Sequence, residues 1–171
     1  MNNVRISFPG PLLKTVDDFW LMVQQNNVPS IVMLCNCVEN NMSKSWQYWP
    51  LEVGHTMVLG EVRDNLELEV SLVKEEDRGH FMIRSFVITD SETGDKRSVK
   101  QYHYLNWPDF DVPRNPKQFL EFLFAVRESG CFKEGSGPPV GESSGSTSFS
   151  HLHAKLDLFF LDSLNDVCST R

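Results

Sequence analysis

The chain lacks the features that mark several classes of protein. It contains no apolar run of about 18 residues, so no transmembrane helix is predicted. Its 23 acidic residues outnumber its 16 basic residues, and the net charge of -7 argues against nucleic acid or an anionic membrane as the main partner. The polar start at residues 1–5, soon followed by Pro9 and Gly10, is unlike a secretory signal.

Cysteine is scarce and follows no recognisable pattern. The four cysteines are Cys35, Cys37, Cys131 and Cys168. Their spacing fits neither a disulfide framework nor the two-residue knuckles of zinc sites. His151 and His153 would face the same way on a strand, but no further metal ligand accompanies them. We therefore expect reduced thiols, no metal and no cofactor in a cytoplasmic protein.

What the sequence does contain is typical of one folded domain. The 171 residues are 40% apolar and 11% aromatic, which is enough to build a sizeable core. Apolar spacing predicts a helix that includes Phe19 and Trp20, with Thr15 or Asp17 as its N-cap. The continuous apolar run at residues 30–35 predicts a strand that is covered on both faces.

The middle of the chain is rich in alternating patterns. Runs at residues 66–73, 80–88 and 96–104 predict an antiparallel meander. A second helix is expected from Pro116 to about Gly130, with Asn115 as its N-cap. The first nine residues are expected to be irregular, and the composition of residues 134–150 is that of a flexible linker.

A short loop at residues 107–113 reads Trp-Pro-Asp-Phe-Asp-Val-Pro. Its two prolines stiffen the backbone and hold Asp109 between the rings of Trp107 and Phe110. A carboxylate beside apolar rings is partly desolvated, which favours the protonated form that a general acid needs near neutral pH. A turn without chemistry is the alternative on the local sequence alone.

The segments around this loop resemble the catalytic domain of the protein tyrosine phosphatases. The motifs that carry the resemblance are the loop itself, Gly10-Pro11-Leu12, residues 19–23, residues 47–50, His103-Tyr104, residues 122–130 and residues 137–140. They are most similar to the intracellular non-receptor members of type 1 and T-cell kind. The resemblance implies an α+β fold of three α/β/α layers, with an incomplete twisted mixed sheet and flanking helices. It also implies phosphotyrosine proteins as partners.

The resemblance assigns roles to individual residues. It implies that Asp109 is the general acid of phosphotyrosine hydrolysis. The supporting residues are Trp107, Pro108, Phe110, Glu39 and Lys44. Glu39 matches the acid that braces the arginine of the phosphate-binding loop, and Lys44 matches the lysine that meets the closed acid loop. Because that arginine is missing here, we expect Glu39 to be an ordinary loop charge.

The chain departs from the family after Val140. There the family pattern continues with one more valine, then His-Cys, five residues and Arg. This chain reads Gly-Glu-Ser-Ser-Gly-Ser-Thr-Ser at residues 141–148, so we expect neither nucleophile nor phosphate clamp. We therefore divide it into a partial phosphatase-like domain at residues 10–140 and a divergent linker and tail at residues 141–171.

Three hypotheses remain open at this level. The chain is a truncated tyrosine phosphatase without activity as written, a non-catalytic binding or regulatory pseudophosphatase, or an unstable splice or gene-model fragment. The third hypothesis rests on the strand that the family places after Val140 in the middle of its sheet. Loss of that strand would expose two unpaired edges and apolar surface.

Overall fold

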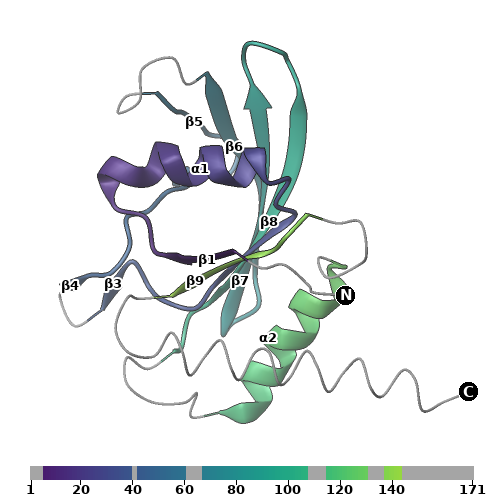
Figure 1. Ribbon diagram of the computed structural model, residues 1–171. Helices are drawn as coiled ribbons and strands as arrows, with labels where there is room; N and C mark the ends of the chain where they lie inside the picture. Colours follow the sequence, from purple (N-terminus) through teal and green to yellow (C-terminus); the bar gives the residue numbers. More distant parts are fainter. Residues whose placement is uncertain (1–5, 40–41, 61–66, 108–114, 131–136, 144–171) are drawn as a thin grey trace, which may run out of the picture.

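The structure, a computed structural model, describes residues 6–39, 42–60, 67–107, 115–130 and 137–143. Its elements are β1 (Ile6–Pro9), η1 (Leu13–Thr15), α1 (Val16–Gln25), β2 (Ser30–Met33), β3 (Val38–Glu39), β4 (Met42–Ser43), β5 (Thr56–Val58), β6 (Leu68–Asp77), β7 (Phe81–Asp90), β8 (Lys96–Tyr104), α2 (Pro116–Glu128) and β9 (Val140–Ser143). Figure 1 shows how these elements are arranged around one long sheet.

Seven of the strands form one mixed sheet in the order β1-β9-β2-β8-β7-β6-β5. The first four strands run parallel to one another, and the pairings from β8 through β7 and β6 to β5 are antiparallel. Strands β3 and β4 form a separate two-stranded hairpin. The mixed sheet and its helices confirm the α+β fold expected from the sequence.

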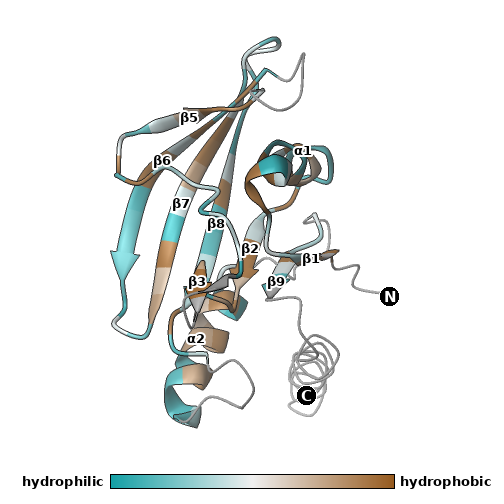
Figure 2. Cartoon of the chain, turned by 90° about the vertical axis from the view of Figure 1, so that its left-hand side faces the viewer, coloured by the Kyte–Doolittle hydropathy of each residue, from teal (hydrophilic) through white to brown (hydrophobic). Residues whose placement is uncertain are grey.

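The two helices cover opposite faces of the sheet. Strand β2 shows this directly, because its successive side chains point to opposite faces. Ile31 and Met33 join the core beneath α1, whereas Val32 joins the core beneath α2. All four residues of β2 are buried, which confirms the prediction of a strand covered on both faces. Figure 2 shows α1 beside the strands and apolar residues distributed along β6, β7 and β8.

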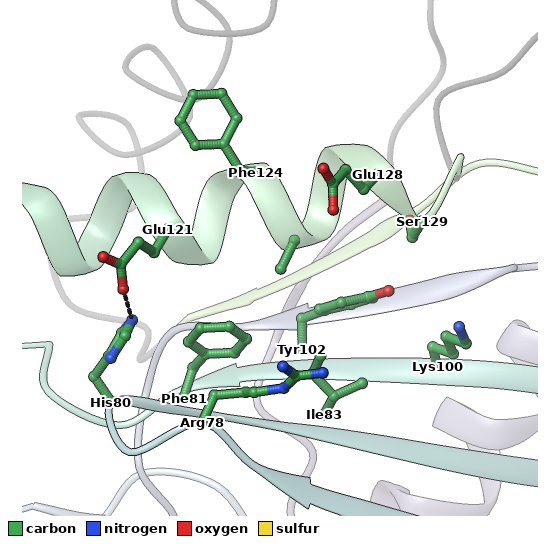
Figure 3. Close-up of a pocket in the computed structure, with 11 residues that line it drawn as sticks. Arg78, His80, Phe81, Ile83, Lys100, Tyr102, Glu121, Phe124, Glu128 and Ser129 are labelled. Atoms are coloured by element: carbon green, nitrogen blue, oxygen red, sulfur yellow. Dashed lines mark ion pairs between the residues drawn. The ribbon is translucent and has the colours of Figure 1, made fainter.

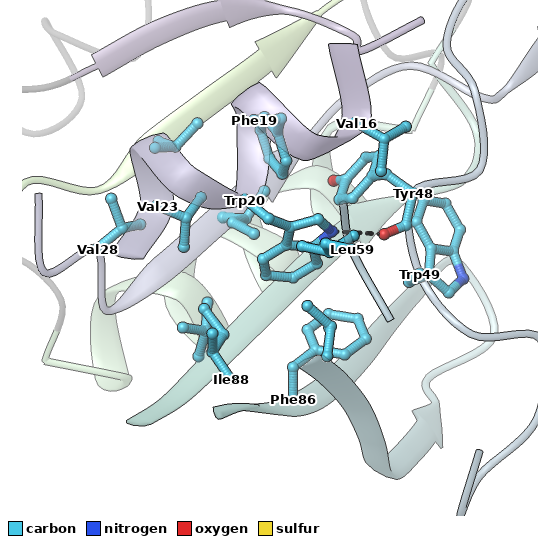
Figure 4. Packing of buried hydrophobic residues seen from close by; sticks show 14 of the residues in the cluster. Val16, Phe19, Trp20, Val23, Val28, Tyr48, Trp49, Leu59, Phe86 and Ile88 are labelled. Carbon is cyan, nitrogen blue, oxygen red and sulfur yellow. Dashed lines mark hydrogen bonds between the residues drawn. The ribbon is translucent and has the colours of Figure 1, made fainter. Parts of the chain in front are cut away.

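Aromatic residues form the centre of the core beneath α1 (Figure 4). Trp20 is completely buried, and its indole N–H donates a hydrogen bond of 2.7 Å to the backbone oxygen of Tyr48. Its ring lies 5.5 Å from that of Phe86 and 5.9 Å from that of Tyr48 in edge-on contacts. Helix α1 is thereby fixed both to the sheet and to the segment that contains Tyr48.

The antiparallel meander forms as predicted from alternation, with one irregularity. Strands β6, β7 and β8 pair in sequence order, and Leu68, Val70 and Leu72 are buried at every second position of β6. The register shifts between Leu72 and Lys74, and Val73, which lies between these two positions, is 49% exposed. A bulge inserts one residue and ends the alternation at that point.

Of the N-caps predicted for the two helices, that of α2 is confirmed, whereas neither residue predicted to cap α1 does so through its side chain. The side-chain oxygen of Asn115 accepts a hydrogen bond from the backbone N–H of Gln118, so the predicted N-cap of α2 is confirmed. Asp17 is not a cap, because it lies inside α1 and its carboxylate accepts the backbone N–H of Gly60 at 3.2 Å. Thr15 stands at the N-cap position, but its hydroxyl bonds to the backbone of Leu12 instead.

The prediction that residues 1–9 are irregular is wrong for its described part. Ile6–Pro9 forms strand β1 at one edge of the sheet, in register with Val140 to Ser143. Proline removes a backbone donor, so it is compatible with an edge strand, and Pro9 occupies the last position of β1.

The hypothesis of an unstable fragment assumed that the chain lacks the strand that the family places after Val140, and this assumption is wrong. Residues Val140–Ser143 form β9, which pairs in parallel with β1 on one side and with β2 on the other. Strand pairing uses main-chain groups, which every non-proline residue supplies, so the unusual side chains here do not prevent it. The sheet therefore continues three residues past the boundary that the sequence pattern indicated at Val140.

Candidate functional site

The predicted acid loop lies mostly outside the described residues. Asp109, Pro108 and Phe110 are among those that the structure does not describe, so the role assigned to Asp109 stays a prediction. Trp107, which begins the loop, is described and half-buried. Its ring meets Tyr104 of β8 at 6.3 Å and Phe119 of α2 at 5.4 Å, both edge-on. The start of the loop is thus packed against the core beneath α2.

The other two predicted residues lie in or beside one hairpin. Glu39 is the last residue of β3 and pairs with Met42 of β4, but its side chain is not described. Lys44 follows β4, is half-buried, and donates its backbone N–H to the oxygen of Cys37 at 2.9 Å. The roles of both residues toward the acid loop stay predictions.

The most unusual polar group in the described structure is Glu142 of β9, which the sequence analysis did not single out. Its side chain is buried, with 1% of the residue exposed. Its carboxyl group contacts the Tyr48 hydroxyl at 2.6 Å, the Ser45 hydroxyl at 2.9 Å and the Cys35 thiol at 3.8 Å. Burial raises the pKa of Glu142 to about 7, and the hydrogen bonds from Tyr48, Ser45 and Cys35 lower that pKa only in part.

Hydrogen bonds continue from Glu142 across the sheet as a polar chain, which comprises the buried residues Glu142, Tyr48, Gln101 and Arg84 and ends at the exposed Glu75. The amide of Gln101 in β8 donates to the Tyr48 hydroxyl at 2.7 Å and accepts from the Arg84 guanidinium of β7 at 3.0 Å. The Arg84 guanidinium donates in turn to the carboxylate of Glu75 in β6. The charge of the arginine is therefore balanced by Glu75 at the end of the chain remote from Glu142.

His103 and Trp49 support the arginine in this chain. The guanidinium of Arg84 lies 4.7 Å from the centre of the Trp49 ring, and one of its nitrogens is 3.2 Å from Nδ1 of His103. The pKa of His103 is lowered to about 4 by burial and then by the charge of Arg84. The imidazole is therefore neutral, with Nδ1 accepting from Arg84 and Nε2 donating to the Cys35 oxygen at 3.0 Å.

A glycine makes room for the carboxyl group of Glu142. A Cβ atom added at Gly10 would lie 2.5 Å from Cβ of Ser45 and 2.8 Å from Oε1 of Glu142. Both separations are well below ordinary contact, so the backbone that follows β1 packs directly against the polar chain. The glycine of the Gly-Pro-Leu motif is thus required sterically, because a larger residue at this position would clash with Ser45 and Glu142.

The described thiols have no character of an activated nucleophile. Cys35 is buried, and its thiol faces the carboxyl of Glu142. Burial, followed by the nearby Glu142, raises the pKa of Cys37 to about 11. A thiol with so high a pKa is protonated at neutral pH, and the thiolate is the form that attacks phosphorus. Cys131 and Cys168 lie outside the described residues.

A hollow of about 530 Å³ lies between α2 and strands β7 and β8 (Figure 3). Phe81 and Tyr102 contribute aromatic surface to it. Its charged residues are the cations Arg78 and Lys100 and the acids Glu121 and Glu128. His80 Nε2 lies 3.4 Å from a carboxylate oxygen of Glu121. Because the charges are of both signs in equal number, they define no single class of ligand.

The described part of the chain offers neither a cluster of metal ligands nor a membrane-spanning helix. Within the described residues, no three side chains of His, Cys, Asp or Glu are grouped so that they could hold a metal ion. None of the helices in the described part of the chain has the length and apolar character needed to cross a bilayer.

Comparison with known proteins gives consistent matches. Residues 2–146 match the model of the protein-tyrosine phosphatase family. The chain is 42% identical over 131 residues to tyrosine-protein phosphatase non-receptor type 61F of Drosophila melanogaster, a match that covers 77% of this chain and 24% of that protein. It is 40% identical over 131 residues to non-receptor type 2 of Mus musculus, covering 77% and 31% of the two chains. It is also 32% identical over 123 residues to receptor-type phosphatase eta of Homo sapiens, covering 72% and 9%. The chain spans less than a third of the length of these relatives.

Proposed function

Because the chain belongs to the protein tyrosine phosphatase family, we propose that it is a phosphatase-type domain with an incomplete reaction centre and negligible hydrolysis of phosphotyrosine. One observation carries this proposal. Counted from Val140, the family valine, histidine and cysteine correspond to Gly141, Glu142 and Ser143. Strand β9 supports this count, because the segment remains a strand of the sheet through Ser143.

The cysteine and arginine that this chain lacks are the groups that lower the activation barrier of phosphotyrosine hydrolysis most. The family nucleophile is a thiolate, and an arginine binds two oxygens of the transferred phosphoryl group through a planar fork. By the same count, Ser143 replaces the cysteine, and Phe149 stands where the arginine belongs. A serine hydroxyl without an adjacent base is a weak nucleophile, and phenylalanine offers no charge to the phosphate.

The acid function is the part of the machinery that the sequence retains. In this proposal Asp109 would protonate the leaving tyrosine oxygen if a nucleophile attacked phosphorus. The packing of Trp107 against Tyr104 and Phe119 supports a fixed start for that loop. A positioned acid alone cannot replace covalent catalysis and charge stabilisation, so activity should fall by many orders of magnitude.

A non-catalytic binding role is the second candidate. The paired β9 and the buried cores on both faces of the sheet favour it, because they support a folded scaffold rather than an unstable fragment. Phosphotyrosine proteins in the cytoplasm are the partners that we propose from the family and from the non-receptor relatives. Activity, substrates and partners of the whole protein belong to this proposal as well, because the chain spans only part of those relatives.

The two candidates are separated by measuring turnover and binding together. The 171-residue chain is incubated with a phosphotyrosine peptide, phosphate release is recorded, and binding of the same labelled peptide is followed by fluorescence anisotropy. We expect no release above background. Saturable binding without release would support the binding role.

Two variants identify the source of any release that is seen. Turnover that disappears in Ser143→Ala would contradict the proposal, because a serine would then be the nucleophile. Turnover at an enzymatic rate that is unchanged in Asp109→Asn would contradict the assignment of the general acid.

A further inference from the structure

Besides its main-chain pairing with β1 and β2, strand β9 is bonded to other segments through the side chain of Glu142. Val140 is buried among apolar residues, whereas Glu142 places a carboxyl group in the interior. The groups around that carboxyl come from two other segments. Cys35 follows β2, while Ser45 and Tyr48 follow β4. The carboxyl therefore connects β9, an interior strand of the sheet, to parts of the chain about one hundred residues away in sequence.

No positive charge accompanies this carboxyl among its described hydrogen-bonding partners, which are Tyr48, Ser45 and Cys35. The titratable groups that face it are Cys35 and Cys37 from the segment after β2 and Tyr48 from the segment after β4. Toward β1 its neighbour is the backbone of Gly10.

The cation of the polar chain lies on the far side of two neutral groups. Strand β8 offers the neutral amide of Gln101, which contacts the carboxyl only through Tyr48. Arg84 is two hydrogen bonds further from Glu142 than Tyr48 is, and it is paired with Glu75. A negative charge on Glu142 would therefore be buried without a counterion, which is costly in a protein interior.

The hydrogen-bond geometry fits a protonated carboxyl. The Ser45 hydroxyl has one proton, yet its oxygen lies 3.1 Å from the backbone oxygen of Trp46 and 2.9 Å from Oε1 of Glu142. Ser45 cannot donate to both oxygens at once. If Oε1 carries a proton, it donates to Ser45, and Ser45 donates to the backbone of Trp46. Tyr48 then still donates to Oε2 while it accepts from Gln101.

We propose that Glu142 is a proton-dependent latch for strand β9. With its proton, the carboxyl group bonds β9 to Ser45 and Tyr48. Without its proton, it leaves an unpaired charge inside the sheet, and β9 separates more readily from the segment that contains these residues. This device does not depend on the proposed phosphatase chemistry, and it would make the pairing of β9 sensitive to pH near neutrality.

The direction of the effect follows from proton linkage. Burial raises the pKa of Glu142 to about 7 in the folded chain, against an ordinary value of 4.5. Between these values the folded state keeps a proton that the unfolded chain releases, so stability falls as pH rises. The folding constant should fall by about tenfold per pH unit in this window and lose no more above it, a total of roughly 300-fold.

The first test compares the pH dependence of folding in the full chain and in Glu142→Gln. The glutamine keeps a polar group of the same size but cannot titrate. Urea denaturation from pH 5 to pH 8.5 should show that the steep loss of stability present in the original chain is absent from Glu142→Gln. Glu128→Gln, on the exposed side of α2, is the matched control and should keep the loss. Equal pH dependence in the original chain and Glu142→Gln would overturn the proposal.

A second measurement needs no variant and serves if Glu142→Gln does not fold. Hydrogen exchange of the amides of β9, corrected for intrinsic rates, should accelerate between pH 6 and pH 8 relative to amides of β6 and β7. Infrared difference spectra over the same range should show the loss of one protonated carboxyl band near neutral pH. A carboxyl that is ionised throughout, or β9 amides that follow those of β6 and β7, would overturn the latch.

Discussion

The two halves of the sheet are stabilised in different ways. In the antiparallel half, β6 and β7 bury alternating apolar side chains such as Val70, Phe86 and Ile88. In the parallel half, β9 lies between β1 and β2 and buries the carboxyl of Glu142 against hydroxyl groups. Apolar burial is insensitive to pH, whereas a buried acid couples folding to protons. We therefore expect substitutions in the two halves to differ both in how much stability they remove and in how that loss depends on pH.

The largest effect is expected in the antiparallel half. Phe86 is completely buried and packs against Trp20, so Phe86→Ala should lower the free energy of unfolding by about 3–5 kcal/mol. Urea denaturation at pH 5 and pH 8 should give the same loss, because no titratable contact is removed. Phe124→Ala, at a residue that is 51% exposed, is the control and should cost far less.

A steric substitution tests the parallel half. Gly10→Ala would place a methyl group against Ser45 and Oε1 of Glu142, and it should destabilise the fold by about 1–3 kcal/mol. Gly141→Ala is the matched control, because a Cβ atom there meets nothing within 4 Å. Its effect should stay within about 0.5 kcal/mol. Thermal denaturation of the two variants measures the difference, and equal effects would contradict the close packing at Gly10.

Removal of the Tyr48 hydroxyl should cause a smaller loss of stability, and the size of that loss should depend on pH. Tyr48→Phe removes the donor to Glu142 and the acceptor for Gln101, at a cost of about 1–2 kcal/mol. The Tyr48 hydrogen bond lowers the pKa of Glu142, which means that it favours the ionised form. The loss measured by urea denaturation should therefore be greater at pH 8 than at pH 5. A loss that is greater at pH 5 would contradict this sign.

The smallest effect is expected at a site remote from both halves of the comparison. Asn115→Ala removes the N-cap of α2 and should cost about 1 kcal/mol. Asn115→Asp keeps an acceptor at the same place and should retain most of the stability. Circular dichroism during thermal denaturation gives both values. A loss in Asn115→Asp equal to that in Asn115→Ala would show that the cap hydrogen bond contributes little.

The antiparallel half was predictable from the sequence because its pattern is local. Alternation in β6 to β8 and the Asn-Pro start of α2 each indicate their structure within a few residues. The family resemblance also identified the fold, because its motifs are spread over most of the chain. The bulge between Leu72 and Lys74 was not predicted, because alternation does not reveal an inserted residue.

The parallel half was not predictable in the same way. Gly141, Glu142 and Ser143 have the composition of a linker, yet they pair with two strands that are distant in sequence. The pairing depends on main-chain groups, and the burial of Glu142 depends on hydroxyl partners near residue 45 that no local pattern indicates. The one clue in the sequence is that Glu142 follows the apolar start of a segment for which the family predicts a central strand. Asp109 and the side chain of Glu39 lie outside the described residues, so their roles remain predictions.

The most direct test of the account is whether residues 140–142 lie between β1 and β2 in solution. Nuclear Overhauser contacts measured on the isotope-labelled chain should connect the backbone of Val140 both to Ile6 of β1 and to Ile31 of β2. The account predicts both sets of contacts at pH 6. Random-coil shifts for residues 140–142, with contacts to neither strand, would contradict it.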